Sequence, residues 1–365
     1  CPARATRVRG PLGWRCRTGA ARPEVYVRAT TGAKELPTGP CGACPTQRTD
    51  GVEGPGRPDG TVATVAAVGG GDGYGEVLVD EWWNRVDRTY HPADGSRVYR
   101  AGGDGDASFL LLHGIGNSGA VFSPLMPALA EFGPVVAPTM SPELLAAPQG
   151  GPTETMTPLV EWLAAIAPPP WRLVGHSMGG VLTGLILRSH PELVRGAVTV
   201  NAPLPGVIDR IRGRDTVDRT GRALLFMKLL SQVTSFGRPR LPGFLRGTEL
   251  AIVRNALRGF VVAPGELDNR TIARAVLRSR TTDGSDFLGL AREMPEWERE
   301  PFDARPVRVI LGADDPLVPD EDLPAVEAMY PAGELVVIER CAHFAHLEQP
   351  RRSLDAIVDF FDRVG

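Results

Sequence analysis

The residues best suited to chemistry surround Ser177, in the run Gly-His-Ser-Met-Gly from Gly175 to Gly179. A serine hydroxyl becomes a useful nucleophile only when a neighbouring base removes its proton. The Gly-x-Ser-x-Gly spacing is typical of a sharp strand-to-helix turn, because residues without side chains let the two elements approach closely. Such a turn pushes the serine oxygen outward, so the pattern predicts that Ser177 is a nucleophile in acyl transfer.

A serine nucleophile needs a base, and two histidines near the carboxyl end are candidates. His343 and His346 follow an apolar run at 335–338 and precede a helical pattern at 353–364. A loop after a strand is a position from which an imidazole can reach a neighbouring strand end. Spacing alone permits either residue, and His343 is favoured because it is nearer to the end of the strand.

The base in turn needs a carboxylate that orients it. Residues 307–311 form an apolar, strand-like run, and Asp314 and Asp315 follow it within the sequence Gly-Ala-Asp-Asp-Pro. Either aspartate could serve, and two solvated turn aspartates would be the ordinary interpretation of this stretch alone. The order Ser, Asp, His, each after a strand, favours a catalytic role because one fold is expected to show it.

The elements that must position these residues alternate between strands and helices. A short apolar run at 171–174 precedes Ser177, and apolar residues at helical spacing follow it at 181–188. Strands alternating with helices imply an α/β fold with a mostly parallel central sheet and helices on both faces. Further strands are expected at 76–86 and 96–101 (a first hairpin), 109–112, 134–137 and 194–200, and helices at 120–132 and 153–167.

Four segments together resemble the α/β-hydrolase fold family, over roughly residues 76–365. They are "LLLHGIG" at 110–116, "VGHSMGG" at 174–180, "GADDPLVP" at 312–319 and "CAHFAHLEQP" at 341–350. The resemblance aligns Asp315 with the family's catalytic acid and His343 with its base. It also implies an oxyanion hole made by the backbone N–H groups of Ile115 and Met178, with His113 holding the loop before Ile115.

The resemblance divides the chain into a core at 76–201 and 306–365 and a helical lid at 202–305. Candidate lid helices are expected at 220–235, 248–262, 267–279 and 287–293. Their apolar faces suggest a small, fairly apolar substrate, although most of those side chains are expected to pack the lid onto the core.

Residues 1–75 are rich in Gly, Pro, Arg and Thr and are expected to be a disordered extension. "CGAC" at 41–44 has the spacing of half a zinc knuckle, but no complete metal site is expected and no cofactor is implied. The net charge of −3 disfavours nucleic-acid partners. The sequence shows no spanning apolar run and no signal-peptide pattern, so a cytoplasmic protein without a membrane span is expected.

Three functional hypotheses follow. The favoured one is a serine hydrolase that cleaves a small, fairly apolar carboxylic ester or related acyl compound through a Ser177-His343-Asp315 triad and an acyl-enzyme. A carbon–carbon bond hydrolase of β-diketone-like compounds would use the same residues. A non-catalytic ligand receptor on the same fold is the alternative of another class. Epoxide and haloalkane hydrolases of the same fold are disfavoured, because the corresponding turn in those enzymes carries Asp where this chain has Ser177.

Overall fold

The structure is a computed structural model that describes residues 26–29, 81–102, 109–141, 144, 152–204 and 306–364. It also describes 250–279, apart from 252, 255–256, 258 and 263–264.

The described residues form a nine-stranded sheet whose central strands are parallel. Antiparallel strands complete both edges. The predicted α/β fold with a mostly parallel sheet is therefore confirmed. In spatial order the strands are β1 (Tyr26–Ala29), β9 (Glu334–Ile338), β8 (Val307–Gly312), β7 (Val194–Val200), β6 (Trp171–His176), β4 (Phe109–Leu112), β5 (Val135–Pro138), β3 (Arg97–Ala101) and β2 (Asp87–Tyr90).

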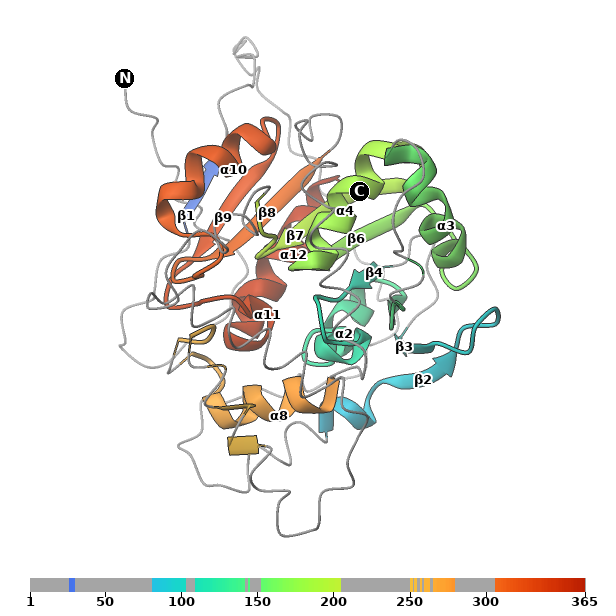
Figure 1. Cartoon of the computed structure of the whole chain (residues 1–365), viewed down its shortest axis with the longest axis horizontal. Helices are drawn as coiled ribbons and strands as arrows, with labels where there is room; N and C mark the ends of the chain where they lie inside the picture. The colour runs from blue at the N-terminus through green and yellow to red at the C-terminus, as the bar shows by residue number, and fades with distance from the viewer. Residues whose placement is uncertain are drawn as a thin grey trace, which may run out of the picture.

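Both faces of the sheet are buried. Successive side chains of a strand point to opposite faces, so a strand contributes to the apolar cluster on each side. In β4, Phe109 and Leu111 join one apolar cluster, whereas Leu110 and Leu112 join the other. Side chains of α3 (Pro152–Ala164), α4 (Met178–Ser189) and α10 (Leu323–Met329) belong to the second cluster, and those of α2 (Met126–Leu129), α8 (Asn269–Ser279) and α12 (Pro350–Val364) to the first. Helices therefore cover the two faces as predicted (Figure 1).

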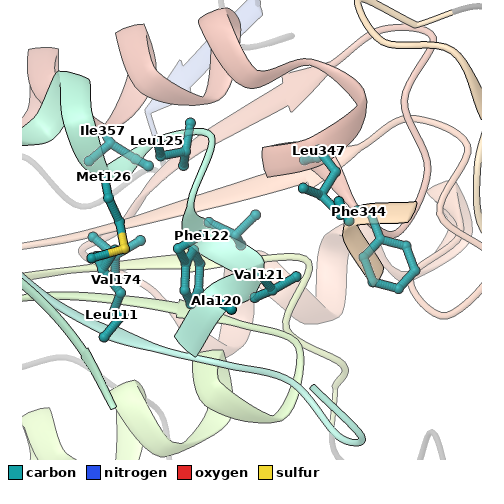
Figure 2. Packing of buried hydrophobic residues seen from close by; sticks show 14 of the residues in the cluster. Leu111, Ala120, Val121, Phe122, Leu125, Met126, Val174, Phe344, Leu347 and Ile357 are labelled. Atoms are coloured by element: carbon teal, nitrogen blue, oxygen red, sulfur yellow. The ribbon is translucent and has the colours of Figure 1, made fainter. Parts of the chain in front are cut away.

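The first cluster packs tightly around α2. Figure 2 shows Met126 with Ile357 of α12 on one side and Leu111 and Val174 on the other. All four side chains are fully or almost fully buried. This contact joins the carboxyl-terminal helix to the strands that lead into the Ser177 turn.

The predicted first hairpin is shifted along the chain. β2 pairs with β3, so the expected strand at 96–101 is present, but its partner starts at Asp87. Residues 81–84 are helical, and Trp82 and Trp83 within them are buried. A short apolar run cannot be assigned to strand or helix by periodicity alone. Here the run is helical, and both tryptophans are buried in the first apolar cluster.

The prediction of one continuous helix at 120–132 is also wrong. The chain forms two short 3-10 segments, η1 (Gly119–Phe122) and η2 (Ala130–Phe132), on either side of the single helical turn of α2. Pro124 and Pro127 lie in this stretch. Proline has no N–H and crowds the preceding turn, so a long helix is broken here.

The sheet begins earlier than expected. β1 lies within the segment predicted to be a disordered extension, and it pairs antiparallel with β9, with Tyr26 opposite Val337 and Ala29 opposite Glu334. The open edge of a strand carries unpaired backbone groups that an extended segment can bond. The prediction that no strand precedes residue 76 is therefore wrong for these four residues, and the rest of 1–75, including its four cysteines, lies outside the described residues.

The expected lid is described only in part. α8 matches the helix expected at 267–279, and residues between 250 and 257 are helical wherever they are described. The helices expected at 220–235 and 287–293 lie outside the described residues. α8 buries Ile272 and Val276 in the first cluster, and it lies below α2 and α11 (Ala345–Glu348) in Figure 1. None of the helices in the described part of the chain has the length and apolar character needed to span a bilayer.

Candidate active site

Ser177 occupies a strained turn between β6 and α4. Its backbone angles are φ 54° and ψ −122°, a conformation that costs a residue with a side chain about 1–3 kcal/mol. The flanking glycines make the turn possible. A Cβ on Gly175 would lie 2.1 Å from the carbonyl oxygen of Gly179, and one on Gly179 would lie 2.0 Å from that of Leu112. The serine is thus held at the carboxyl end of β6, next to the end of β4.

His343 lies against the serine. Its Nε2 is 3.1 Å from Ser177 Oγ, and its Nδ1 is 3.0 Å from Asp315 Oδ2. The three side chains come from segments that follow β6, β9 and β8, and carboxyl ends of neighbouring parallel strands meet at one edge of a sheet. They form one hydrogen-bonded chain from hydroxyl to imidazole to carboxylate.

The two candidate aspartates are separated by burial. Asp314 is exposed, whereas Asp315 is buried and accepts hydrogen bonds through both oxygens. Its Oδ1 accepts the N–H of Leu317 at 2.9 Å, and its Oδ2 accepts Nδ2 of Asn201 at 2.8 Å as well as the imidazole. These donors hold the carboxylate in place beside His343.

Sequence reasoning missed Asn201. This residue directly follows β7, has a positive φ of 50°, and also donates from Nδ2 to the carbonyl oxygen of Ala342 at 3.0 Å. The rule that identified the other residues, a polar side chain at the carboxyl end of a parallel strand, would have identified Asn201 too.

The two candidate histidines are separated by their surroundings. His346 is fully buried, with its ring 4.3 Å from that of His176 and 5.2 Å from that of Phe122. Neither of its ring nitrogens has a hydrogen-bond partner among the described residues. Burial lowers the pKa of His346 to about 3, so the ring stays neutral in the core, whereas His343 is the histidine at the serine.

His176, inside the Gly-x-Ser-x-Gly turn, supports the His343 backbone. Its Nε2 lies 2.8 Å from the carbonyl oxygen of His343, so it carries the proton and donates it. Burial, followed by the nearby His346 and His343, holds the pKa of His176 well below its ordinary value. A neutral imidazole therefore connects the serine turn to the histidine loop.

The loop after β4 passes beside the serine. A Cβ on Gly114 would lie 3.0 Å from Cβ of Ser177, so a larger residue there would crowd the serine. Ile115 is the next residue. Met178 is the first residue of α4, and its N–H therefore has no partner within the helix. Of the two residues expected to supply oxyanion donors, Met178 therefore follows the serine directly in the chain, and Ile115 follows the glycine that lies against the serine.

His113 holds that loop, as expected. Its Nε2 accepts the N–H of Met140 at 3.0 Å, which leaves the proton on Nδ1 to be donated to the carbonyl oxygen of Gly114 at 2.8 Å. Burial lowers the pKa of His113 to about 4. A neutral imidazole therefore ties the start of this loop to the end of β5. Among the described residues, no group of three or more His, Cys, Asp or Glu side chains could hold a metal ion.

The sequence matches known proteins over the region that contains these residues. The model of the alpha/beta hydrolase family matches residues 109–356. The pimeloyl-[acyl-carrier protein] methyl ester esterase of Aeromonas hydrophila is 25% identical over 260 residues, which cover 69% of this chain and 94% of the relative. The 2-(acetamidomethylene)succinate hydrolase of Mesorhizobium japonicum is 24% identical over 261 residues, which cover 69% of this chain and 87% of the relative.

A solved structure is similar as well. Cfl2 of Burkholderia cenocepacia superposes with a TM-score of 0.53 at 19% identity, covering 76% of this chain and 95% of that one. At this identity the likeness concerns the fold. Because the family model spans more than half of the chain and includes the serine turn and both partner loops, the protein belongs to the alpha/beta hydrolase family.

Proposed function

We propose that the protein is a serine hydrolase that cleaves a small, fairly apolar carboxylic ester through an acyl-enzyme. The observation that carries the proposal is the hydrogen-bonded chain from Ser177 Oγ through His343 to Asp315. A serine, a histidine and a buried carboxylate in this order are the groups that activate a hydroxyl for attack on an acyl carbon. The Aeromonas relative, named as a methyl ester esterase, supports an ester as the substrate.

In the first half-reaction, Ser177 Oγ attacks the acyl carbon while His343 Nε2 accepts the hydroxyl proton. The carbonyl electron pair moves onto oxygen and forms a tetrahedral oxyanion, which the N–H groups of Ile115 and Met178 stabilise. The oxyanion collapses, the bond to the alcohol oxygen breaks, and His343 returns the proton to the departing alcohol. Removing one oxyanion donor typically costs about 10²–10³ in turnover.

In the second half-reaction, water takes the place of the alcohol. His343 Nε2 accepts a proton from the water as its oxygen attacks the acyl-enzyme, and Ser177 leaves with that proton. Asp315 keeps the proton of His343 on Nδ1 throughout, so that Nε2 faces the serine with a free lone pair. The carboxylate also stabilises the imidazolium that exists between the two transfers.

The surroundings of His343 support an apolar acyl group. The rings of Phe260 and Phe344 lie 5.8 and 5.5 Å from its ring, and both side chains are buried. Buried aromatic rings beside the base give this side of the serine apolar surroundings, which favour an apolar substituent on the substrate.

A fluorophosphonate probe tests the proposal, because it labels activated serines. We expect labelling of the wild type, and loss of labelling together with about 10⁶ of turnover in Ser177→Ala. Ser189→Ala is the matched control: Ser189 ends the same helix, where its hydroxyl donates to the carbonyl oxygen of Leu185. This control variant should be labelled normally.

A panel of p-nitrophenyl esters and β-diketones, assayed on the same proteins, identifies the bond that is cleaved. Turnover of the diketones alone would replace the ester by a carbon–carbon bond. Labelling that persists in Ser177→Ala would refute the assignment of the nucleophile. No labelled serine in the wild type would favour a ligand receptor.

A further inference from the structure

A buried carboxylate outside the Ser177-His343-Asp315 chain holds the loop that carries His343. Oε1 of Glu348 accepts the backbone N–H groups of Ala342 and Phe344 at 3.1 and 3.0 Å. Its Oε2 accepts that of Ala342 at 3.1 Å and that of Val262 at 2.7 Å. Ala342 and Phe344 are the residues on either side of His343, so the carboxylate is bonded to the backbone immediately before and after the base.

Hydrogen bonds around Glu348 also join the histidine loop to the segment that leads into α8. The N–H of His343 donates to the carbonyl oxygen of Phe260 at 3.0 Å, and the N–H of Glu266 donates to that of Glu348 at 2.7 Å. Gly265 leaves room for the second of these bonds, since a Cβ there would lie 2.5 Å from the backbone carbonyl oxygen of Glu348. Together with the bond from Val262, three hydrogen bonds connect the two segments.

The chemistry of this site requires a carboxylate. All of the groups that Glu348 contacts through its oxygens are N–H donors, and an ionised carboxylate is the side chain that only accepts. Glu348 is fully buried, and burial raises its pKa to about 7 despite the three backbone donors, which lower it. Burying a carboxylate is unfavourable, and here the hydrogen bonds from the backbone donors offset part of that desolvation cost.

We propose that Glu348 is a positioning residue for the hydrolysis: it fixes the backbone on both sides of His343 and so sets the distance from Nε2 to Ser177 Oγ. Through Val262 it also ties that distance to the placement of the segment before α8. The proposal rests on the proposed function, because it assumes that His343 acts as the base. A displacement of about 1 Å in a reacting group can lower turnover on the order of 10²-fold.

Glu348→Gln is the test, because it keeps the size of the side chain but presents an NH₂ group to backbone N–H donors. We expect kcat for a p-nitrophenyl ester to fall about 10- to 100-fold with KM within about twofold. The downfield proton resonance of His343 Nδ1–H should shift or broaden, because the loop that holds the imidazole is no longer fixed.

Glu334→Gln is the matched control for lost stability. Glu334 is a partly buried carboxylate at the start of β9, at the other end of this strand from the His343 loop, and it is bonded to Arg308 of β8 and Arg363 of α12. The control variant should melt at a lower temperature while kcat and the His343 resonance stay at their wild-type values.

If Glu348→Gln is obtained only in inclusion bodies, Glu348→Asp decides the question, because it retains the charge and the acceptors and shortens their reach by one methylene. It should fold and show the same loss of kcat at nearly constant KM. A folded Glu348 variant with wild-type kcat and an unchanged resonance would overturn the proposal, as would a loss of kcat equally large in Glu334→Gln. A wild type that no fluorophosphonate labels would instead refute the proposed function.

Discussion

Replacing Asp315 by asparagine separates the two adjacent aspartates. In the wild type, Oδ2 of Asp315 accepts from His343 Nδ1 and Asn201 Nδ2, while Oδ1 accepts from the Leu317 N–H. An asparagine has only one acceptor oxygen. Whichever way its amide is turned, the NH₂ group faces at least one of these donors.

The NH₂ group can be accommodated if it donates to His343 Nδ1, which moves the imidazole proton to Nε2. That tautomer cannot accept the proton of Ser177, because Nε2 is the atom 3.1 Å from the serine oxygen. Holding the wrong tautomer costs a serine triad about 10⁴ in turnover. This loss corresponds to about 5.5 kcal/mol of transition-state stabilisation.

Asp314→Asn is the matched control. The Asp314 side chain is exposed, and its backbone N–H, which donates to the carbonyl oxygen of Cys341 at 2.8 Å, is unaffected by the substitution. We expect its kcat/KM for a p-nitrophenyl ester to stay within about threefold of the wild type, as is usual for surface substitutions. Melting temperatures measured alongside would exclude unfolding as the cause of any loss. Equal losses in the two variants, or a larger loss in Asp314→Asn, would refute the assignment of Asp315.

Two further predictions concern stability. The pKa of His346 is lowered from 6.5 to about 3 by burial, so below pH 6.5 the unfolded chain binds a proton at this residue that the folded chain does not. The folded state therefore has its full stability above pH 6.5 and loses stability as the pH falls towards 3. At about pH 4.5 this lowers the free energy of unfolding by ~3 kcal/mol, and His346→Phe should remove that pH-dependent loss. Urea unfolding at pH 7 and 4.5 measures the difference, and an unchanged pH dependence in the variant would contradict the prediction. A chain that begins at Gly75 loses β1 but retains every residue from β2 onwards, so we expect unchanged turnover and a melting temperature within a few degrees of the full chain's. Zinc in the purified full-length protein, or a large loss of stability on truncation, would indicate instead that the cysteines of 1–75 form a module on the core.

The sequence by itself determined the features that depend on neighbouring residues. The serine turn was predicted because its glycines and its apolar flanks are adjacent in the chain, and the structure shows that both glycines are sterically required. The strand at 194–200 and the helix expected at 267–279, which spans Asn269–Ser279, were predicted for the same reason: hydrophobic periodicity is a local property.

Local patterns failed where packing or backbone chemistry overrode them. Residues 81–84 of the strand expected at 76–86 form a helical turn that buries two tryptophans, and the helix expected at 120–132 is broken in the stretch that contains Pro124 and Pro127. The edge strand β1 was missed because its pairing partner lies some three hundred residues away in the chain, at β9.

Only the tertiary structure decided which member of each candidate pair joins the hydrogen-bonded chain that starts at Ser177. Spacing could not separate Asp314 from Asp315 or His343 from His346, because the members of each pair are close together in the chain. The motif resemblance favoured Asp315 and His343, and the geometry places His343 beside Ser177 and Asp315 beside His343. The strand-end position of Asn201 could be read from the sequence, but its bond to Asp315 and the bond of Glu348 to Val262 join segments that are far apart in the chain. A buried polar group must find partners wherever the fold brings donors together, and that convergence exists only once the chain has folded.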